Sequence, residues 1–145
     1  MPTRTALTDW TGTLQEGGGQ VELVSSHAAT FPVSFPRRAA DDAGGVTSPE
    51  ELIGAAHSAC YAMALSGAVA AAGGTPRAFE VRADVTLRPD GSGGFSITGI
   101  VLTVRGEVDG LDEAAFVAAA QSAKENCPVS KALTGTTITL DAALA

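Results

Sequence analysis

Cysteine is scarce in this sequence: among 145 residues, only Cys60 and Cys127 are cysteines. Two cysteines are too few for the disulfide framework of a small secreted domain. Basic residues are scarce too, because 9 Lys and Arg stand against 16 Asp and Glu, for a formal net charge of -7. An acidic chain repels phosphate backbones, so the composition argues against a nucleic-acid partner.

Charged residues make up only 17% of the chain, against about 25% in an average soluble protein. Hydrophobic residues make up 45%, which excludes a disordered polymer. The length is that of one domain, so we expect residues 1–145 to form a single domain. Low charge with many alanines also predicts that much of the surface is covered, for example by a second copy of the chain.

Targeting signals are not apparent. Residues 1–20 contain no apolar run, so no signal peptide is predicted, and a cytoplasmic location with reduced thiols is the default expectation. Residues 52–72 carry no formal charge, but they are built largely from Ala, Gly and Ser rather than from Leu, Ile and Phe. Small residues contribute little to membrane insertion, so we expect a helix buried on all sides rather than a membrane span.

The hydrophobic pattern predicts an α+β fold of order βββ-α-ββ-α-β with a long buried central helix. Ser48 as N-cap, Pro49 in the first turn and Glu51 completing a capping box mark the start of that helix. Gly73 and Gly74 stop it near residue 72. A glycine turn at 17–19 and a polar loop at 37–46 are also expected. The predicted strands are 5–16, 20–25, 31–35 (at a sheet edge), 79–88, 95–108 and 136–140, and the later helices are 112–126 and a short turn at 128–133.

The two cysteines differ in their local setting. Cys60 falls in the middle of the central helix, where a lone cysteine is most often a small buried hydrophobe. Cys127 ends a helix just before Pro128, so it could cap the next helix, where amide groups lower the pKa of a thiol. If the helices pack together, one thiolate could be oxidised to a sulfenic acid and the other could condense with it to a disulfide. A structural role for each cysteine remains open.

A reactive thiolate in a buried site needs a positive charge beside it. Arg37 and Arg38 stand in the loop before the central helix, and Glu50 in its first turn could clamp one of them. The competing interpretation is a solvated loop and a carboxylate that stabilises the helix dipole. Spacing alone favours that second interpretation.

His57 lies one helical turn before Cys60, a spacing compatible with a metal site or with Cys–His hydrolysis. Further metal ligands are not apparent, because His27 is the only other histidine. An orienting group for hydrolysis is also missing from the motif, and Asn126 is the only asparagine. The glycine-rich stretches precede strands, which is typical of turns rather than of phosphate loops. We therefore expect neither a metal nor a cofactor.

Two segments carry a family resemblance. Residues 47–65 read TSPEELIGAAHSACYAMAL, and residues 123–133 read AKENCPVSKAL. The first resembles the central-helix signature of the OsmC/Ohr family (osmotically inducible protein C and organic hydroperoxide resistance), and the second resembles its second cysteine motif. The order of the motifs, their separation and the chain length agree with the family, so the resemblance covers nearly the whole chain.

The resemblance implies a thiol-dependent peroxidase that acts on organic hydroperoxides. By position, Cys60 corresponds to the peroxidatic cysteine and Cys127 to the resolving one. Glu50 corresponds to the carboxylate that holds the catalytic arginine, which is Arg38 by its place after an aromatic residue, with Arg37 as the fallback.

The resemblance also implies an assembly and a reductant. Only one arginine, Arg4, precedes Arg37, which favours the OsmC branch. The family fold implies an intertwined homodimer with active sites at the subunit interface, and a dithiol reductant that is either a lipoylated protein or a small dithiol. Two alternatives stay open: a non-catalytic, stress-related binding module of the same fold, and a Cys–His hydrolase that uses Cys60 without Cys127.

Overall fold

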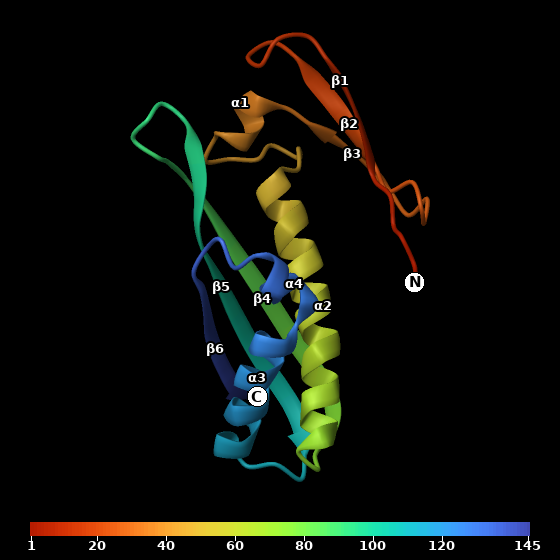
Figure 1. Ribbon diagram of the computed structural model, residues 1–145, viewed down its shortest axis with the longest axis vertical. Helices are drawn as coiled ribbons and strands as arrows, with labels where there is room; N and C mark the ends of the chain where they lie inside the picture. Colours follow the sequence, from red (N-terminus) through yellow and green to blue (C-terminus); the bar gives the residue numbers. More distant parts are fainter. The chain divides into compact units, whose positions relative to one another are not determined.

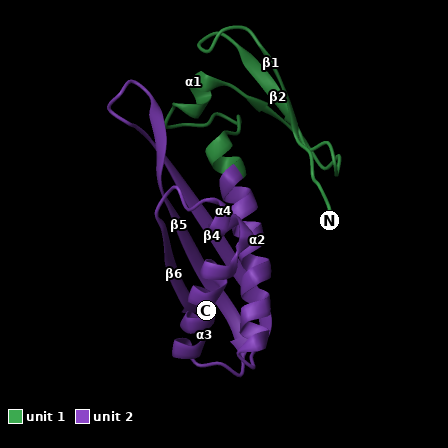
Figure 2. Cartoon of the chain, viewed as in Figure 1, with its two compact units in different colours: residues 1–52 green, residues 53–145 purple.

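The computed structural model describes residues 1–145, which divide into two compact units (Figure 2). Residues 1–52 form unit 1, and residues 53–145 form unit 2. The element order confirms the α+β class and the order βββ-α-ββ-α-β, with the expected short helical turn after residue 127 and one unexpected short helix before the central one (Figure 1). The expectation of a single domain over residues 1–145 stays a prediction.

Unit 1 contains an antiparallel sheet of three strands in the order β1-β2-β3. Strand β1 (Leu7–Thr11) is shorter than expected, and β2 (Gly18–Glu22) begins earlier. The turn falls before the glycine run: Gly12 adopts a φ of 92°, which favours glycine. Strand β3 (Thr30–Val33) lies at the sheet edge, as predicted.

Helix α1 (Phe35–Arg38) corrects the expected loop at 37–46, since Arg37 and Arg38 belong to this short helix. Pro36 lies in its first turn, where its missing N–H is not needed and its fixed φ suits a helix. The Arg38 amide closes the turn by donating to the Ser34 carbonyl at 3.0 Å. The polar segment after α1 carries no further helix or strand before residue 49.

Helix α2 (Pro49–Ala71) begins and ends as the sequence predicts. The Glu51 amide donates to Ser48 Oγ at 3.2 Å, which is half of the expected capping box. The Glu51 carboxylate instead accepts a hydrogen bond from the Thr47 hydroxyl. At the far end, Gly73 adopts a φ of 88° and the Gly74 amide donates to the Val69 carbonyl, a pattern that stops a helix.

Within this single chain only one face of α2 is buried. Burial on all sides needs a cover from outside the chain, such as the expected second copy, and stays a prediction. The buried stripe includes His57, Tyr61, Leu65 and Val69. The opposite face is exposed and built largely of small apolar residues, with Met63 fully in solvent at 75% exposure. By length and hydropathy, α2 could cross a membrane, a test that the core helix of a soluble protein also passes.

Unit 2 is built on a mixed sheet in the order β4-β5-β6. Strands β4 (Thr75–Pro89) and β5 (Phe95–Asp109) form a long antiparallel hairpin, and β4 begins four residues before the expected strand. Strand β6 (Ile138–Leu144) runs parallel to β5. Parallel neighbours need a crossover, and α3 (Glu113–Asn126) with α4 (Pro128–Ala132) supplies it.

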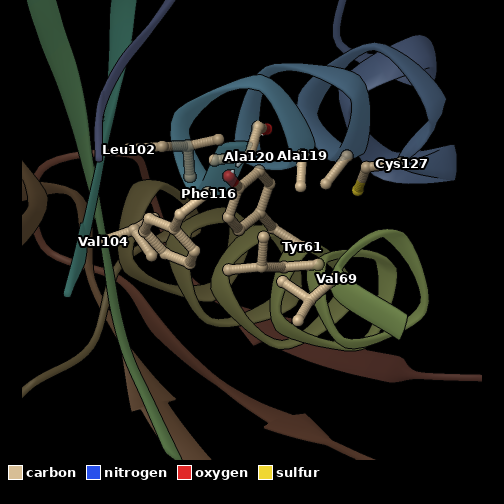
Figure 3. Packing of buried hydrophobic residues seen from close by; sticks show 10 residues of the cluster. Tyr61, Val69, Leu102, Val104, Phe116, Ala119, Ala120 and Cys127 are labelled. Atoms are coloured by element: carbon tan, nitrogen blue, oxygen red, sulfur yellow. Dashed lines mark hydrogen bonds between the residues drawn. The ribbon is translucent and has the colours of Figure 1, made fainter. Parts of the chain in front are cut away.

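The core of unit 2 lies between the sheet and helices α2 and α3 (Figure 3). Leu102 and Val104 of β5 belong to one buried cluster with Tyr61 of α2 and Phe116 of α3. The Tyr61 hydroxyl donates to the Ala120 carbonyl at 2.9 Å, so a buried hydrogen bond also links the two helices. The helices that carry the two cysteines are therefore held together on one face of the sheet.

Gly106 of β5 provides a test of this packing. A Cβ placed there would lie 2.6 Å from Phe116 Cζ, so Gly106→Ala is expected to destabilise the protein by about 1–3 kcal/mol through overpacking. On the same strand, Gly99→Ala is the matched control, since its Cβ would meet only the Thr137 carbonyl at an ordinary 3.7 Å. Urea denaturation measures both. Equal midpoints for the two variants would contradict the packing.

Candidate active site: a cysteine pair and an arginine–glutamate ion pair

The two cysteines lie close together in unit 2. Cys60 on α2 is half-buried and packs against the core cluster to which the completely buried Cys127 belongs. Cys127 ends α3 and begins α4, so it occupies the predicted boundary between two helices. Figure 3 shows its sulfur on the side of α3 that faces α2. Both thiols are free, and each perturbs the ionisation of the other.

The surroundings favour a thiolate on Cys127. Burial raises the pKa of Cys127, but the nearby Ser130 amide, Cys60 thiol, Ser130 hydroxyl and Val129 amide together outweigh burial and lower that pKa. These amides belong to the first turn of α4, as expected for a thiol at a helix start.

The pKa of Cys60 is shifted in the opposite direction. Burial is the largest influence and raises the pKa of Cys60; the Val129 amide lowers it, Cys127 raises it again, and the net effect is a raised pKa. Within unit 2, the first negative charge of the pair is therefore favoured on Cys127. A cation beside Cys60 would reverse this order, because an opposite charge stabilises the ionised thiol.

Unit 1 contains an ion pair with a nearly buried carboxylate. Arg38 Nη2 lies 2.7 Å from Glu50 Oε1, and Arg38 Nε lies 3.2 Å from both carboxylate oxygens. Glu50 is only 7% exposed, and its hydrogen bond raises the pKa of Arg38. Arg37 is exposed and lies over Gly44. The residue paired with Glu50 is therefore Arg38.

Arg38 also borders an apolar cavity of about 390 Å³ within unit 1. Aromatic and aliphatic side chains from the sheet, from α1 and from the start of α2 form most of its wall. They include Trp10, Leu14, Val21, Val33, Phe35 and Leu52. An apolar cavity with one charged group at its wall is the usual form of a site for a small organic molecule.

His57 does not interact with Cys60 in the way a hydrolytic base would. Its Nε2 lies 2.8 Å from Ser130 Oγ, and its Nδ1 is buried without a hydrogen-bond partner. The structure also contains no group of three or more His, Cys, Asp or Glu side chains that could hold a metal ion. Ser130 was not singled out from the sequence, although its place three residues after Cys127 in the first turn of α4 was an available signal.

Four of the five residues proposed from the sequence therefore occur as two groups. Cys60 and Cys127 meet in unit 2, and Arg38 meets Glu50 in unit 1. Arg37, the fallback, joins neither group. One residue of each group lies on α2: Glu50 in its first turn and Cys60 near its middle.

A profile of OsmC-like proteins matches residues 41–141. The chain belongs to the OsmC-like family. Both motifs quoted above lie within the matched residues, so the resemblance inferred from them is confirmed. The peroxiredoxin OsmC of Escherichia coli (strain K12) is 42% identical over 132 residues, which are 91% of this chain and 90% of that protein.

Other OsmC-like proteins show the same relationship. An organic hydroperoxide resistance protein of Xanthomonas axonopodis pv. citri (strain 306) is 35% identical over 121 residues, 82% of each chain. The solved structure of OhrB from Bacillus subtilis matches with a TM-score of 0.75 and 26% identity, over 97% of each chain. An organic hydroperoxide resistance protein of Legionella pneumophila shares the fold with a TM-score of 0.78 over 99% of this chain and 98% of that one.

Proposed function

We propose that this chain is a thiol-dependent peroxidase that reduces organic hydroperoxides. The observation that carries the proposal is the neighbouring pair of free thiols, of which Cys60 is half-buried and Cys127 completely buried. Relatives named peroxiredoxin and organic hydroperoxide resistance protein support a role in peroxide detoxification. The more accessible thiol meets the oxidant, and the buried thiol resolves the product.

In the first step, the Cys60 thiolate attacks the terminal oxygen of the hydroperoxide. The sulfur–oxygen bond forms as the oxygen–oxygen bond breaks, which leaves a Cys60 sulfenic acid and an alkoxide that takes a proton to become an alcohol. Arg38, held by Glu50, stabilises the thiolate and the departing alkoxide. The raised pKa of Cys60 within unit 2 is a physical reason why such a cation is needed.

In the second step, Cys127 condenses with the Cys60 sulfenic acid, and a disulfide and water are formed. An external dithiol then reduces the disulfide by thiol–disulfide exchange and becomes oxidised itself. We propose a lipoylated protein or a small dithiol as this reductant, and no metal or cofactor takes part.

The apolar cavity beside Arg38 supports an organic substrate. Its walls are mostly apolar, so it favours an alkyl hydroperoxide over hydrogen peroxide, since burying an alkyl group releases free energy in proportion to its apolar area. In this proposal, Arg38 at the cavity wall supplies the cation for the peroxide group.

We also propose a homodimer. The exposed face of α2 carries Ala55, Ala59, Met63 and Gly67, and small residues allow close approach of a second helix. A contiguous apolar surface of this kind is typical of an interaction site. In such a dimer, the Arg38–Glu50 pair and the cysteine pair that form one site could come from different subunits.

A Cys–His hydrolase fits the geometry less well. Such an enzyme needs an imidazole to accept a proton from Cys60, whereas His57 Nε2 is engaged with Ser130. A non-catalytic binding module would need no thiol chemistry at all. The two alternatives and the peroxidase therefore differ in what a peroxide does to the cysteines.

The decisive experiment is mass spectrometry of the reduced protein after one equivalent of cumene hydroperoxide. A peroxidase is expected to lose the mass of two hydrogens, and peptide mapping should join Cys60 to Cys127. Unchanged mass would support a binding module, and acid release from an activated ester with unchanged thiols would support the hydrolase.

Replacing Cys127 with serine should separate the two steps. Cys127→Ser is expected to consume about one equivalent of hydroperoxide and then stop, because the sulfenic acid has no partner thiol. Dimedone labelling measures the trapped sulfenic acid, and excess peroxide should drive Cys60 to sulfinic acid. Continued cycling at the unmodified rate with a dithiol would remove Cys127 from the mechanism.

A further inference from the structure

A buried hydrogen bond joins two polar side chains that the proposed mechanism leaves unused. His57 on α2 is completely buried, Ser130 on α4 is 6% exposed, and His57 Nε2 lies 2.8 Å from Ser130 Oγ. Burying an imidazole with one unpartnered nitrogen costs free energy that an apolar side chain would not cost. This cost indicates a role beyond packing.

The position of the proton on His57 follows from its partners. Nδ1 is buried without a partner, and an orphaned buried N–H is rarer than an orphaned acceptor. The proton therefore belongs on Nε2, and burial lowers the pKa of His57, which favours the neutral ring. In this form Nε2–H donates to Ser130 Oγ, which leaves the Ser130 hydroxyl hydrogen available for another acceptor.

The candidate acceptor nearest in the chain is the sulfur of Cys127. Cys127 is the N-cap of α4, and Ser130 follows in the first turn of the same helix. The amide and the hydroxyl of Ser130 both act on this thiol: burial raises the pKa of Cys127, and these two donors help to lower it. The buried His57–Ser130 hydrogen bond therefore adjoins the thiol at the start of α4, and the Ser130 hydroxyl hydrogen is not committed to His57.

We propose that His57 and Ser130 form a buried relay, in which His57 orients the Ser130 hydroxyl to donate a hydrogen bond to Cys127 as its sulfur attacks Cys60. The inference rests on the proposed function, because it concerns the second step. Both are positioning residues for that step, since neither reacts.

The chemistry of the step is balanced without another reactant. The Cys127 thiolate attacks the sulfur of the Cys60 sulfenic acid, the sulfur–sulfur bond forms, and the sulfur–oxygen bond breaks. The departing hydroxide takes up one proton, which equals the proton that Cys127 lost, and leaves as water. The relay stabilises the thiolate without storing a proton, because His57 remains neutral throughout.

Two titratable side chains interact with Cys127. Cys60 approaches from α2, and each cysteine alters the ionisation of the other. The pKa of Tyr61 is raised by burial and by the charge of Cys127, while its hydroxyl donates to the Ala120 carbonyl. A measurement on Cys127 must therefore be made with Cys60 replaced and with Tyr61 present in the control.

The first test measures condensation of the sulfenic acid by rapid quench after a single addition of cumene hydroperoxide. Ser130→Ala is expected to slow disulfide formation about tenfold, the value of a hydrogen bond to a charged group. Ser130→Thr keeps the hydroxyl and should recover most of the rate. Ser58→Ala is the matched control on α2, since Ser58 Oγ donates to the Ala55 carbonyl instead.

A double-variant cycle tests the link to His57. His57→Leu should also slow condensation, whereas His57→Gln keeps a donor near the position of Nε2 and should recover part of the rate. Because His57 acts through Ser130, the variant with both His57→Leu and Ser130→Ala should be no slower than Ser130→Ala alone. Independent, multiplying effects would overturn the relay.

The second test needs no peroxide. In a Cys60→Ala background, thiolate absorbance followed against pH reports the ionisation of Cys127, with the variant lacking both cysteines as the control for Tyr61. Adding Ser130→Ala should raise the pKa of Cys127, and an unchanged titration would overturn the relay. Failure of the unmodified chain to form the Cys60–Cys127 disulfide would instead overturn the proposed function and leave this titration interpretable. Circular dichroism confirms that each variant is folded.

Discussion

Cys60→Ser is expected to abolish peroxide consumption, with a loss of about a thousandfold or more, as when the nucleophile of a covalent enzyme is removed. A serine hydroxyl is not ionised at neutral pH, whereas the thiolate is the nucleophile of the proposed first step. Stopped-flow or coupled assays of cumene hydroperoxide with excess dithiol measure the rate. Cys127→Ser, compared in the same assay, should still support about one turnover.

The comparison of these two variants also tests which thiol reacts first with the hydroperoxide. Within unit 2 the pKa of Cys127 is lowered and that of Cys60 is raised, so ionisation alone would name Cys127 as the first nucleophile. Access argues the other way, because Cys127 is completely buried and Cys60 is not. If Cys60→Ser still consumed about one equivalent of hydroperoxide and Cys127→Ser consumed none, the peroxidatic and resolving roles would be reversed.

Arg38→Ala is expected to slow the first step about a hundredfold, comparable to removing one donor from an oxyanion-binding site. Without the guanidinium, the thiolate of Cys60 and the departing alkoxide both lose a charged hydrogen-bond donor. Glu50 would also be left nearly buried without its partner, so the variant should be less stable as well. Single-turnover formation of the sulfenic acid measures the effect.

The pH dependence of Arg38→Ala has a definite sign. A cation near a thiol lowers its pKa, so removal of Arg38 should raise the pKa of Cys60. The rate of the first step should then rise at a higher pH than in the unmodified protein. Arg38→Lys should recover only part of the rate, because an ammonium cannot reproduce the bidentate contact with Glu50.

Arg37→Ala is the matched control for this prediction. Arg37 neighbours Arg38 on α1, carries the same charge and is exposed, while only Arg38 pairs with Glu50. Its replacement should leave the first step within about a factor of two, as for a solvated surface charge. A large loss in Arg37→Ala together with a normal rate in Arg38→Ala would transfer the role to Arg37.

Local signals in the chain were sufficient for the long helix and for the position of Cys127. Ser48, Pro49 and the glycines at 73–74 define the ends of α2 through capping geometry, which involves only neighbouring residues. Pro128 likewise marks the boundary of α3 and α4, so the placement of Cys127 at that boundary is confirmed.

Strand ends and the segment 35–46 were predicted less well. Strand β4 begins at Thr75 because it pairs with Asp109 of β5 across a long hairpin, and alternation in the sequence alone does not show where pairing stops. Helix α1 was missed because four residues carry too little periodicity to be seen. Arg37 and Arg38 consequently occupy a helix rather than a loop.

By itself, the sequence determined the class of fold, the central helix, the family, and the positions of the two cysteines within and between helices. Capping, periodicity and motif order are encoded over short stretches, which is why these features could be predicted. Only the tertiary structure decided that Glu50 pairs with Arg38, that α2 leaves one apolar face uncovered, and that His57 meets Ser130. Such contacts join residues up to 73 positions apart. They depend on how buried surfaces pack and on the desolvation that packing imposes, neither of which is expressed in any local pattern.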